Sequence, residues 1–433
     1  MLFKDIAILD ENFDYAAGMW VGVKDDTIDY IGASAPENAA DYGETYDGAG
    51  KLLMPAFYNA HAHAPMTLLR GYAENAPLQQ WLNEMVWPFE AKMNGEDNYW
   101  ATALSCAEMM RFGCVSFSDM YYHTPLRAKA VGEAGMKANL CEGLLAFEPK
   151  PYKEYPVCQA NEEYFSTLHG AFDGRILMEY NIHAEYTSNP VVCADIAQLA
   201  KEKGAGIHVH ISETKNEHEE CKQRHDGMTP VQYFDSLGVL DVPVTAAHCV
   251  WVEEDDMDIM AQKGVTCVCN PASNMKLASG FAPIPRMLEK GINVALGTDG
   301  MASNNNHDMM QDMYLMALLY KGNQLDPTVI TPKQALYAAT RGGALAQGRA
   351  DCGLVKVGFK ADLCVLDVTG PAWAPMHNPL CNVVYAGHGS DVVLTLCDGK
   401  KIYENGVYFG VDVEKAKAEV TSRLQRICEE LKA

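Results

Sequence analysis

The sequence predicts a protein of the α/β class, built around a closed (β/α)8 barrel of the TIM type. From about residue 55 to 350, short apolar runs alternate with segments of helical periodicity, which is typical of parallel strands joined by helical crossovers. The runs number eight, as in a closed barrel of this kind. At both chain ends the pattern changes to short strands with turn signals, which predicts a small β-sandwich domain.

The eight predicted barrel strands are apolar runs of strand length. The first, MPAFYNAHAH, covers residues 54–63. The other seven are CVSFSDM at 114–120, ANLCEGLL at 138–145, ILMEYNIH at 176–183, GIHVHIS at 206–212, VTAAHCV at 244–250, VTCVCNP at 265–271 and INVALGTDG at 292–300.

The two chain ends are expected to form one domain together. Before the barrel, β runs lie at 3–10, 19–33 and 44–55, and after it at 361–370 and 390–410. We therefore expect a composite β-sandwich domain of residues 1–54 and 354–433, which also carries an amphipathic C-terminal helix from Val413. The barrel domain is then expected to span residues 55–353.

Composition and charge are those of an ordinary globular protein, with 48% hydrophobic and 21% charged residues. The net charge of −23 disfavours nucleic acid and anionic membranes as partners. No run is apolar and long enough to span a bilayer, and the acidic N-terminus does not resemble a secretory signal. The fourteen cysteines are scattered, so we expect free thiols and a reducing, cytoplasmic location.

Histidines and acids stand where the barrel strands are expected to end, which is where active sites of this fold lie. His61 and His63, two residues apart on one strand, face the same side. His210 and Asp299 end two further strands. A lone histidine at a strand end is more often a packing residue. Four good metal ligands at one barrel mouth, however, predict a metal site.

Three more residues near these strand ends call for an interpretation. Glu213 follows His210 by three residues, and His248 ends the sixth strand. His208 lies one pleat below His210, so we expect it behind the ligands or in the core.

Longer motifs carry a resemblance to a known family. PAFYNAHAHAPMTLLRG, HVHISET, AAHC, CNPASNMKLASG and LGTDGMASNNN occur in this order. They resemble the amidohydrolase superfamily, and most closely its branch of methylthioadenosine/S-adenosylhomocysteine deaminases and chlorohydrolases. GFKADLCVLD and VVLTLCDGKKIYENG are similar to that family's C-terminal sandwich strands, so the resemblance covers essentially the whole chain.

The resemblance implies that four residues bind one divalent ion, usually zinc in this branch: His61, His63, His210 and Asp299. Members with two metals bridge their ions with a modified lysine or a glutamate on the fourth strand. Here that strand has no lysine, and Glu179 comes too early in it for a comfortable bridge. A single metal ion is therefore predicted.

The resemblance also implies catalytic roles. A zinc ion lowers the pKa of a bound water towards about 7. Glu213 would donate a proton to the ring nitrogen beside the carbon that the water attacks. Asp299 would pass a proton from that water to the departing ammonia, and His248 would orient and stabilise the attacking oxygen.

Four further residues are expected to contact the substrate. His183 resembles the family's contact to the purine ring, and Glu90 resembles the acid that binds ribose hydroxyls. Trp81 resembles a pocket-wall aromatic residue, although a core or surface tryptophan is nearly as common. Ser303 either contacts the substrate or shapes the loop after Asp299.

The predicted function is hydrolytic deamination of an adenosine-type purine nucleoside to the inosine-type product and ammonia. The substrates considered are 5′-methylthioadenosine, S-adenosylhomocysteine and adenosine. Alternatives on the same scaffold are deamination of a free base or pterin, and chlorohydrolysis. A non-catalytic scaffold is disfavoured because no metal ligand is missing. The family's habit is to form homo-oligomers, which we also expect here.

One departure from the family concerns the 5′ group of the nucleoside. Members that bind S-adenosylhomocysteine often place an arginine after the third strand. Here EGLLAFEPKPYKEYP has only Lys150 and Lys153. Because lysines are usually solvated surface residues, we expect neutral 5′ groups to be preferred.

Overall fold

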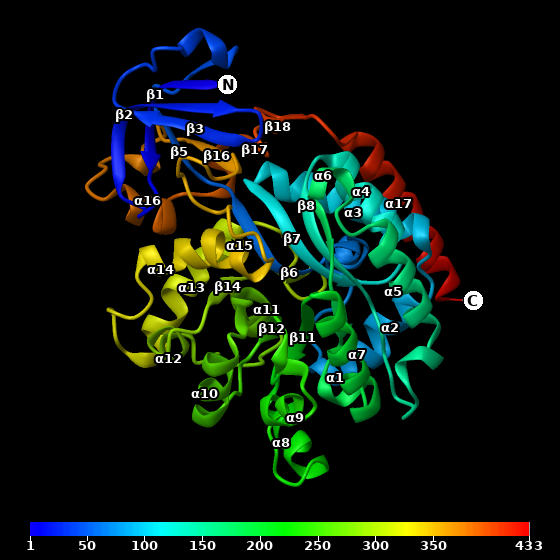
Figure 1. Cartoon of the computed structure of the whole chain (residues 1–433). Coiled ribbons are helices and arrows are strands. Elements are labelled where there is room, and N and C mark those ends of the chain that lie inside the picture. The colour runs from blue at the N-terminus through cyan, green and yellow to red at the C-terminus, as the bar shows by residue number, and fades with distance from the viewer. Residues whose placement is uncertain (433) are drawn as a thin grey trace.

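The barrel strands form two parallel sheets that together make one closed barrel (Figure 1). In the computed structural model, which describes residues 1–432, the sheet orders are β10-β11-β12-β13-β14 and β15-β6-β7-β8-β9. The fourth predicted strand is split at Glu179 into β9 and β10, and the eighth is split at Gly297 and Thr298 into β14 and β15. The two halves of each strand connect the sheets, which confirms the predicted (β/α)8 barrel. The bounds are β6 Phe57–His63, β7 Cys114–Tyr121, β8 Lys137–Glu142, β9 Ile176–Met178, β10 Tyr180–Ile182, β11 Ile207–Ile211, β12 Val244–His248, β13 Thr266–Cys269, β14 Val294–Leu296 and β15 Asp299–Gly300.

Helices connect successive strands and surround the barrel (Figure 1). Local sequence signals set their ends: the Asn94 side chain accepts the backbone N–H groups of Glu96 and Asp97 at the start of α3, and Gly135 in the left-handed conformation ends α4. The main helices are α3 Gly95–Arg111, α4 Thr124–Ala134, α5 Pro156–Thr167, α7 Pro190–Lys203, α8 Lys215–Arg224, α9 Pro230–Ser236, α10 Glu254–Lys263, α11 Pro271–Lys276, α12 Ile284–Glu289, α13 Met309–Gln324, α14 Pro332–Tyr337 and α16 Pro379–Tyr385.

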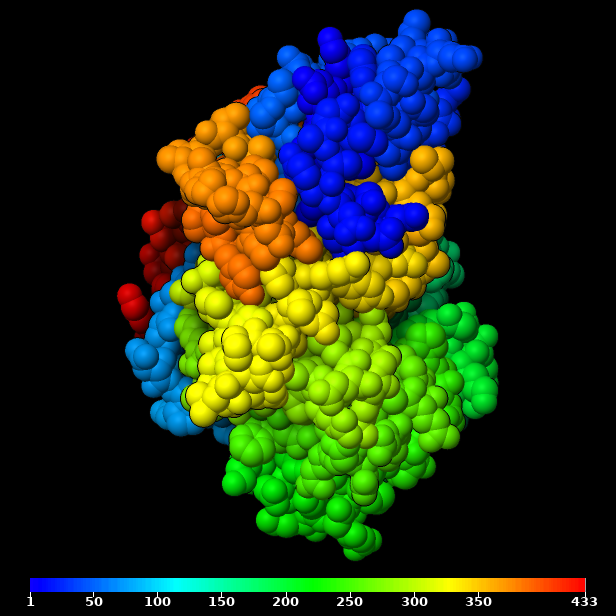
Figure 2. Space-filling model, turned by 90° about the vertical axis from the view of Figure 1, so that its left-hand side faces the viewer, coloured from blue at the N-terminus to red at the C-terminus, as the bar shows by residue number. Residues whose placement is uncertain are grey.

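Both chain ends contribute strands to one additional sheet of nine strands. β5 joins the two contributions, because it pairs in parallel with β1 and antiparallel with β16. Figure 2 shows the N-terminal segment and the segment around residues 360–400 side by side at one end of the molecule. The predicted additional domain is therefore built from both ends, while its limits at residues 54 and 354 stay a prediction. The bounds are β1 Leu2–Leu9, β2 Tyr15–Lys24, β3 Thr27–Gly32, β4 Thr45–Asp47, β5 Lys51–Pro55, β16 Leu363–Asp367, β17 Val392–Cys397, β18 Lys400–Glu404 and β19 Val407–Tyr408.

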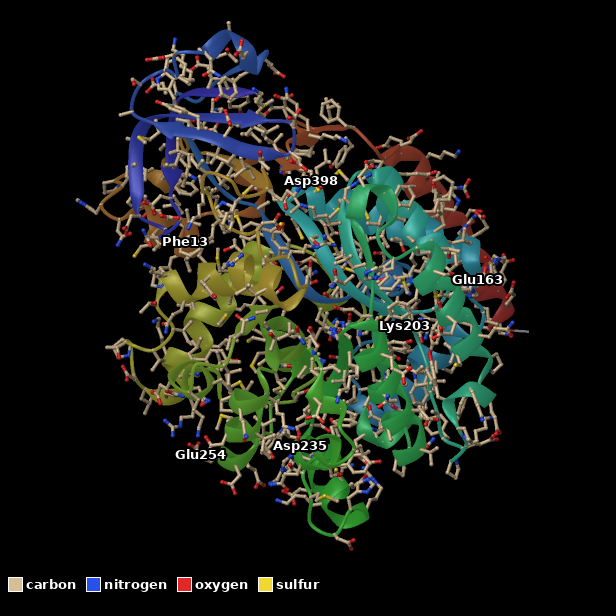
Figure 3. All side chains as sticks on the ribbon, in the orientation of Figure 1. Phe13, Glu163, Lys203, Asp235, Glu254 and Asp398 are labelled. Atoms are coloured by element: carbon tan, nitrogen blue, oxygen red, sulfur yellow. The ribbon has the colours of Figure 1, made fainter. Side chains whose placement is uncertain are left out.

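A buried polar cluster joins this sheet to the beginning of the barrel strands. Lys137, the first residue of β8, forms ion pairs with Asp362 and, at 2.7 Å, with Asp398. The Tyr58 hydroxyl donates to the same Asp362 carboxylate. Figure 3 labels Asp398 at this junction between sheet and barrel. Because the sheet covers the N-terminal ends of the strands, their C-terminal ends at the other side are available for a site.

The C-terminal helix α17 (Val413–Glu430) extends from the sheet and lies along the outside of the barrel (Figure 1). Arg426 Nη2 is 2.5 Å from an Asp97 carboxylate oxygen on α3, and Arg423 Nε is 3.5 Å from the other. Across residues 1–432, no helix is apolar over the length that a membrane span requires. All fourteen cysteines are free thiols.

Candidate active site and metal centre

Four side chains from three strands meet inside the C-terminal end of the barrel. His61 and His63 come from β6, His210 comes from β11 and Asp299 begins β15. The three histidines offer ligand nitrogens that all lie within 4.8 Å of one another. Asp299 Oδ1 is 3.3 Å from His61 Nε2 and 3.2 Å from His63 Nε2. The four residues that the sequence singled out are thus brought together.

The donor set fits a divalent cation. His63 Nδ1 is 2.6 Å from the Met120 carbonyl and His210 Nδ1 is 2.7 Å from the His183 carbonyl, so each ring can donate Nδ1–H and leave Nε2 free as a ligand. His61 Nε2 is buried and lacks a hydrogen-bond partner among the described residues. Burial lowers the pKa of His61 to about 4, which keeps the ring neutral at pH 7.

His208 lies behind the ligands, as its position in the strand predicts. Its Nε2 is 2.8 Å from His61 Nδ1, on the side of the His61 ring away from Asp299. Its pKa is lowered well below the usual value by burial, so it acts as a neutral hydrogen-bond partner that fixes the orientation of His61.

Asp299 is held by two serine hydroxyls. Ser273 Oγ donates to Asp299 Oδ2 over 2.6 Å, and Ser303 Oγ donates to the same oxygen over 2.9 Å. The other oxygen, Oδ1, therefore points to the histidines. Among residues 1–432, Ser303 is not one of those that line the cavity, so it lies against Asp299 rather than at the substrate surface.

Glu213 and His248 lie next to each other at the edge of the metal-ligand cluster. Glu213 Oε2 is 3.8 Å from His248 Nε2, and His248 Nδ1 is 2.9 Å from Asn274 Oδ1. His248 also belongs, with His61 and Asp299, to a group whose ligand atoms lie within 4.8 Å of one another. Burial raises the pKa of Glu213, which favours its protonated form and suits a proton donor.

A cavity opens from these residues towards the segment that follows β6. It contains about 700 Å³ of empty space, open solvent at its mouth included. Glu90, His183 and Trp81 all line it, together with His63, His210, Glu213, His248 and Asp299. The segment that closes over the cavity consists of α1 (Leu78–Gln80), a π-helical turn Trp81–Val86 and α2 (Trp87–Glu90).

The three predicted substrate-contact residues that line the cavity differ in their surroundings. Burial raises the pKa of Glu90 to about 7, although the Tyr121 hydroxyl and His63 act to lower it. Its Oε1 is buried without a hydrogen-bond partner in the described part of the chain. Burial lowers the pKa of His183 to about 3, so its ring is neutral. The Trp81 indole N–H donates to the Ala73 carbonyl over 3.1 Å, which fixes the ring in the cavity wall.

Sequence reasoning missed several residues of the cavity wall. Tyr121 and Tyr122 end or follow β7, so the rule that sites lie at strand ends could have found them. Asn181, Tyr186 and Leu277 also line the cavity, but no spacing in the sequence marks them.

Glu179 lies apart from the metal-ligand cluster. Its Oε1 accepts a hydrogen bond of 2.7 Å from Asn139 Nδ2. It belongs to none of the groups of possible metal ligands found within residues 1–432.

The sequence matches one family model and is similar to curated proteins that share one name. Residues 52–402 match the model of a family described as the amidohydrolase family. The chain is 42% identical to a 5-methylthioadenosine/S-adenosylhomocysteine deaminase of Pelotomaculum thermopropionicum over 89% of this chain and 88% of that protein. It is 40% identical to a protein of the same name from Moorella thermoacetica, over 98% of this chain and 99% of that protein.

Solved structures are similar over nearly the whole chain. A zinc-bound adenosine deaminase from Xanthomonas campestris has 28% identity and a TM-score of 0.92, covering 99% of this chain and 98% of that one. A zinc-complexed atrazine chlorohydrolase from Arthrobacter aurescens has 20% identity and a TM-score of 0.89, covering 98% of this chain and 99% of that one. At that identity the second similarity shows the fold alone.

We expect active protein to contain about one divalent ion per chain, because a single set of four ligands converges here. Elemental analysis of the native protein measures this. His210→Ala should lower the metal content, whereas Glu179→Gln, the matched change at a distant buried acid, should leave it unchanged. Two equivalents per chain in fully active protein, reduced to one by Glu179→Gln, would contradict the single-metal site.

Proposed function

Because the chain belongs to the amidohydrolase family, we propose that it removes the amino group of an adenosine-type purine nucleoside by hydrolysis, releasing ammonia and the inosine-type product. The observation that carries this proposal is one cavity lined by three of the four proposed metal ligands, the buried Glu213 carboxyl group and the Glu90 carboxyl group. The relatives named as 5-methylthioadenosine/S-adenosylhomocysteine deaminases support the substrate class, as does the similarity to an adenosine deaminase.

His61, His63, His210 and Asp299 would hold one zinc ion, which would activate a water for the attack. His248, placed by Asn274, orients the attacking oxygen and stabilises its charge. Asp299 accepts the proton of the attacking water at its carboxylate and passes it to the leaving ammonia. The two serine hydroxyls on Oδ2 fix this carboxylate in one orientation.

Glu213 donates its proton to the ring nitrogen next to the attacked carbon. Burial raises its pKa, which favours the protonated form that a donor needs, and its carboxyl group lies 3.8 Å from His248, the residue proposed to orient the attacking oxygen. The neutral His183 ring contacts the purine from the neighbouring strand end. Trp81 forms part of the wall, whereas Ser303 acts through Asp299.

The remainder of the cavity suits a ribose with a neutral 5′ group. A carboxylate can accept hydrogen bonds from both hydroxyls of a cis-diol, and Glu90 has a buried oxygen that is free to do so. The nearby wall is apolar, with Leu78, Leu82 and Val86 from the covering segment. No lysine or arginine is among the cavity-lining residues of the described chain. Lys150 instead pairs with Glu148.

We also propose that the enzyme works as a homo-oligomer in the cytoplasm. The free state of all fourteen cysteines supports a reducing compartment. The oligomer rests on the family resemblance alone.

Glu213→Gln should retain the metal but lower turnover by roughly two to four orders of magnitude, the usual contribution of a proton-transfer group. Steady-state kinetics with metal analysis on the same sample measures both. Asp299→Asn serves as the comparison, because it should lower metal content and rate together. Near-full activity of Glu213→Gln would rule out Glu213 as the donor and make His248 the next candidate.

An ammonia-release screen over purines, nucleosides and 5′-thio nucleosides tests the substrate assignment. Adenosine-type nucleosides should be deaminated, and 5′-methylthioadenosine should exceed S-adenosylhomocysteine in kcat/KM because the cavity wall offers no cation for the amino-acid carboxylate. Free adenine should be poor, since it lacks the ribose. Preference for a free base, a pterin or a triazine would overturn the nucleoside assignment but leave the metal site intact.

Glu90→Ala should weaken transition-state binding of nucleosides by about 1.5 to 3 kcal/mol, the range for hydrogen bonds to a charged group.

In the wild type, kcat/KM for a nucleoside should rise as pH increases from 6 to 8, because the Glu90 pKa of about 7 leaves the carboxyl protonated below that pH. This rise in kcat/KM, the pH limb, should be absent in Glu90→Gln. A residual rate on free adenine should change with neither variant. An unchanged pH limb in Glu90→Gln would exclude Glu90 as its origin.

A further inference from the structure

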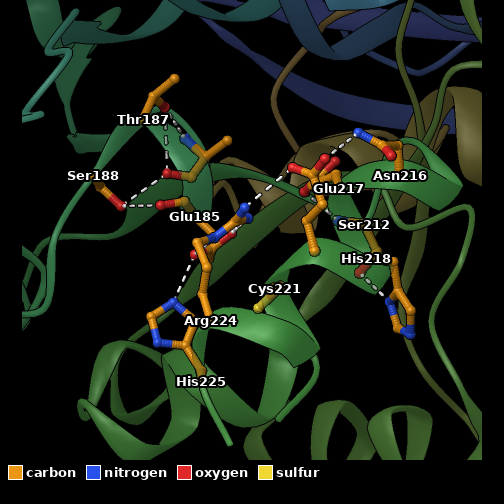
Figure 4. Close-up of polar contacts among 12 residues, drawn as sticks. Glu185, Thr187, Ser188, Ser212, Asn216, Glu217, His218, Cys221, Arg224 and His225 are labelled. Carbon is orange, nitrogen blue, oxygen red and sulfur yellow. Dashed lines mark hydrogen bonds and ion pairs between the residues drawn. The ribbon is translucent and has the colours of Figure 1, made fainter. Parts of the chain in front are cut away.

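A second glutamate, Glu217 on α8, binds the loop that carries Glu213. Glu217 Oε1 accepts the backbone N–H of Ser212 over 2.9 Å, and Oε2 accepts the N–H of Glu213 over 2.8 Å and that of Thr214 over 3.4 Å. One carboxylate thus bonds three consecutive amides of the loop between β11 and α8. Figure 4 shows Glu217 and Ser212 in this arrangement.

The loop has a backbone conformation that needs such support. Ser212 has a φ of 49°, in the left-handed region that costs a residue with a side chain roughly 1 kcal/mol or more. This turn directs Glu213 towards His248. Other groups of Ser212 are bonded as well: its hydroxyl lies 3.1 Å from His218 Nδ1 and its carbonyl accepts the Trp251 N–H over 3.0 Å.

Helix α8 is also anchored at its far end. Arg224 Nε and Nη2 are 3.1 Å and 2.5 Å from the Glu185 carboxylate oxygens, and His225 Nε2 is 2.6 Å from one of them (Figure 4). Glu185 lies two residues after His183 in the loop that follows β10. The helix therefore connects the loop of the proposed proton donor with the loop of the proposed purine contact.

Burial raises the pKa of Glu217 to about 8, although the backbone N–H groups of residues 212–214 act to lower it. The side chain is 3% exposed and has no cationic group within hydrogen-bond distance among the described residues. A buried carboxylate without a cationic partner is costly, and only converging N–H donors offset that cost. The three hydrogen bonds from backbone N–H groups offset the cost of burying Glu217. They do so in the loop whose conformation determines the direction of the Glu213 side chain.

We propose that Glu217 is a positioning residue for the deamination reaction: it binds the 212–214 amides and thereby holds the Glu213 carboxyl group at the ring nitrogen that it protonates. The inference rests on the proposed function, because it gives Glu213 the donor role. Glu217 itself touches neither substrate nor metal.

The test is a double-mutant cycle between Glu217→Gln and Glu213→Gln. A glutamine keeps the shape of Glu217 but turns an N–H group towards a backbone N–H, so the loop loses at least one bond. In the wild-type background, Glu217→Gln should lower kcat roughly ten- to hundredfold, with KM and metal content nearly unchanged. In the Glu213→Gln background it should lower kcat less than about twofold, because there is no longer a donor to position.

Glu219→Gln is the matched control. It makes the same substitution on the same helix, at an exposed position without a side-chain hydrogen bond in the described chain, and should leave kcat unchanged. Hydrogen exchange of the 212–214 amides gives a readout without activity: exchange should accelerate in Glu217→Gln and not in the control. If Glu217→Gln fails to fold, Glu217→Asp, which keeps a carboxyl group but shortens its reach, takes its place in the cycle.

The outcomes distinguish failure of the positioning role of Glu217 from failure of the donor role of Glu213. If Glu217→Gln lowers kcat by the same factor in both backgrounds, the positioning role is overturned, and Glu217 has a structural role only. Unchanged kcat with unchanged amide exchange would also overturn it. If Glu213→Gln alone does not lower turnover, the proposed catalytic role of Glu213 fails instead, and faster amide exchange would still report whether Glu217 holds the loop.

Discussion

The arrangement depends on one pairing, the parallel contact between β15 and β6 that closes the barrel. Its register places Asp299 opposite Ala62 and Gly300 opposite His63. Asp299 therefore lies beside the two histidines of β6, although most of the barrel separates them in the sequence. The approach is close: a Cβ on Gly297 would lie 2.9 Å from the His61 Cβ and 2.5 Å from Asn270 Oδ1. Only glycine lets the eighth strand come near enough for the Asp299 carboxylate to lie against both rings.

The same end of the barrel concentrates backbone strain. Ser212, His248 and Asp299 all have positive φ, at 49°, 72° and 62°, and each either carries or precedes a side chain for which we propose a catalytic role. Such conformations persist only where the surroundings determine them. Here hydrogen bonds do so: Glu217 on the 212–214 amides, Asn274 on His248, and the two serines on Asp299. Side chains outside the ligand cluster thus fix the positions of the groups to which we assign catalytic roles.

The sequence predicts the barrel and the ligand set because both follow from local patterns. Strand-length runs mark the strands, and two-residue spacing puts His61 and His63 on one face. The hydrogen bond from Ser303 to Asp299 was not predictable, since it depends on how the loop after β15 folds back. The sequence also did not predict on which side of the barrel α17 packs. That position depends on ion pairs of Arg423 and Arg426 with Asp97, which is far away in the sequence. Contacts between distant loops leave no periodic signal in the chain.

Two carboxyl groups, Glu90 and Glu213, line one cavity, and the proposed reaction needs a proton on Glu213 and a charged Glu90. Burial raises the pKa of both Glu90 and Glu213. Beside Glu213, His248 favours the charged form, whereas burial and Asp299 favour the neutral form that a proton donor needs. Glu90 faces the Tyr121 hydroxyl and His63, which favour its charged form, and a bound cis-diol would add two further donors. In the proposed reaction a bound nucleoside would therefore favour the charged form of Glu90, and a ring without ribose would lack the hydroxyl donors that do so.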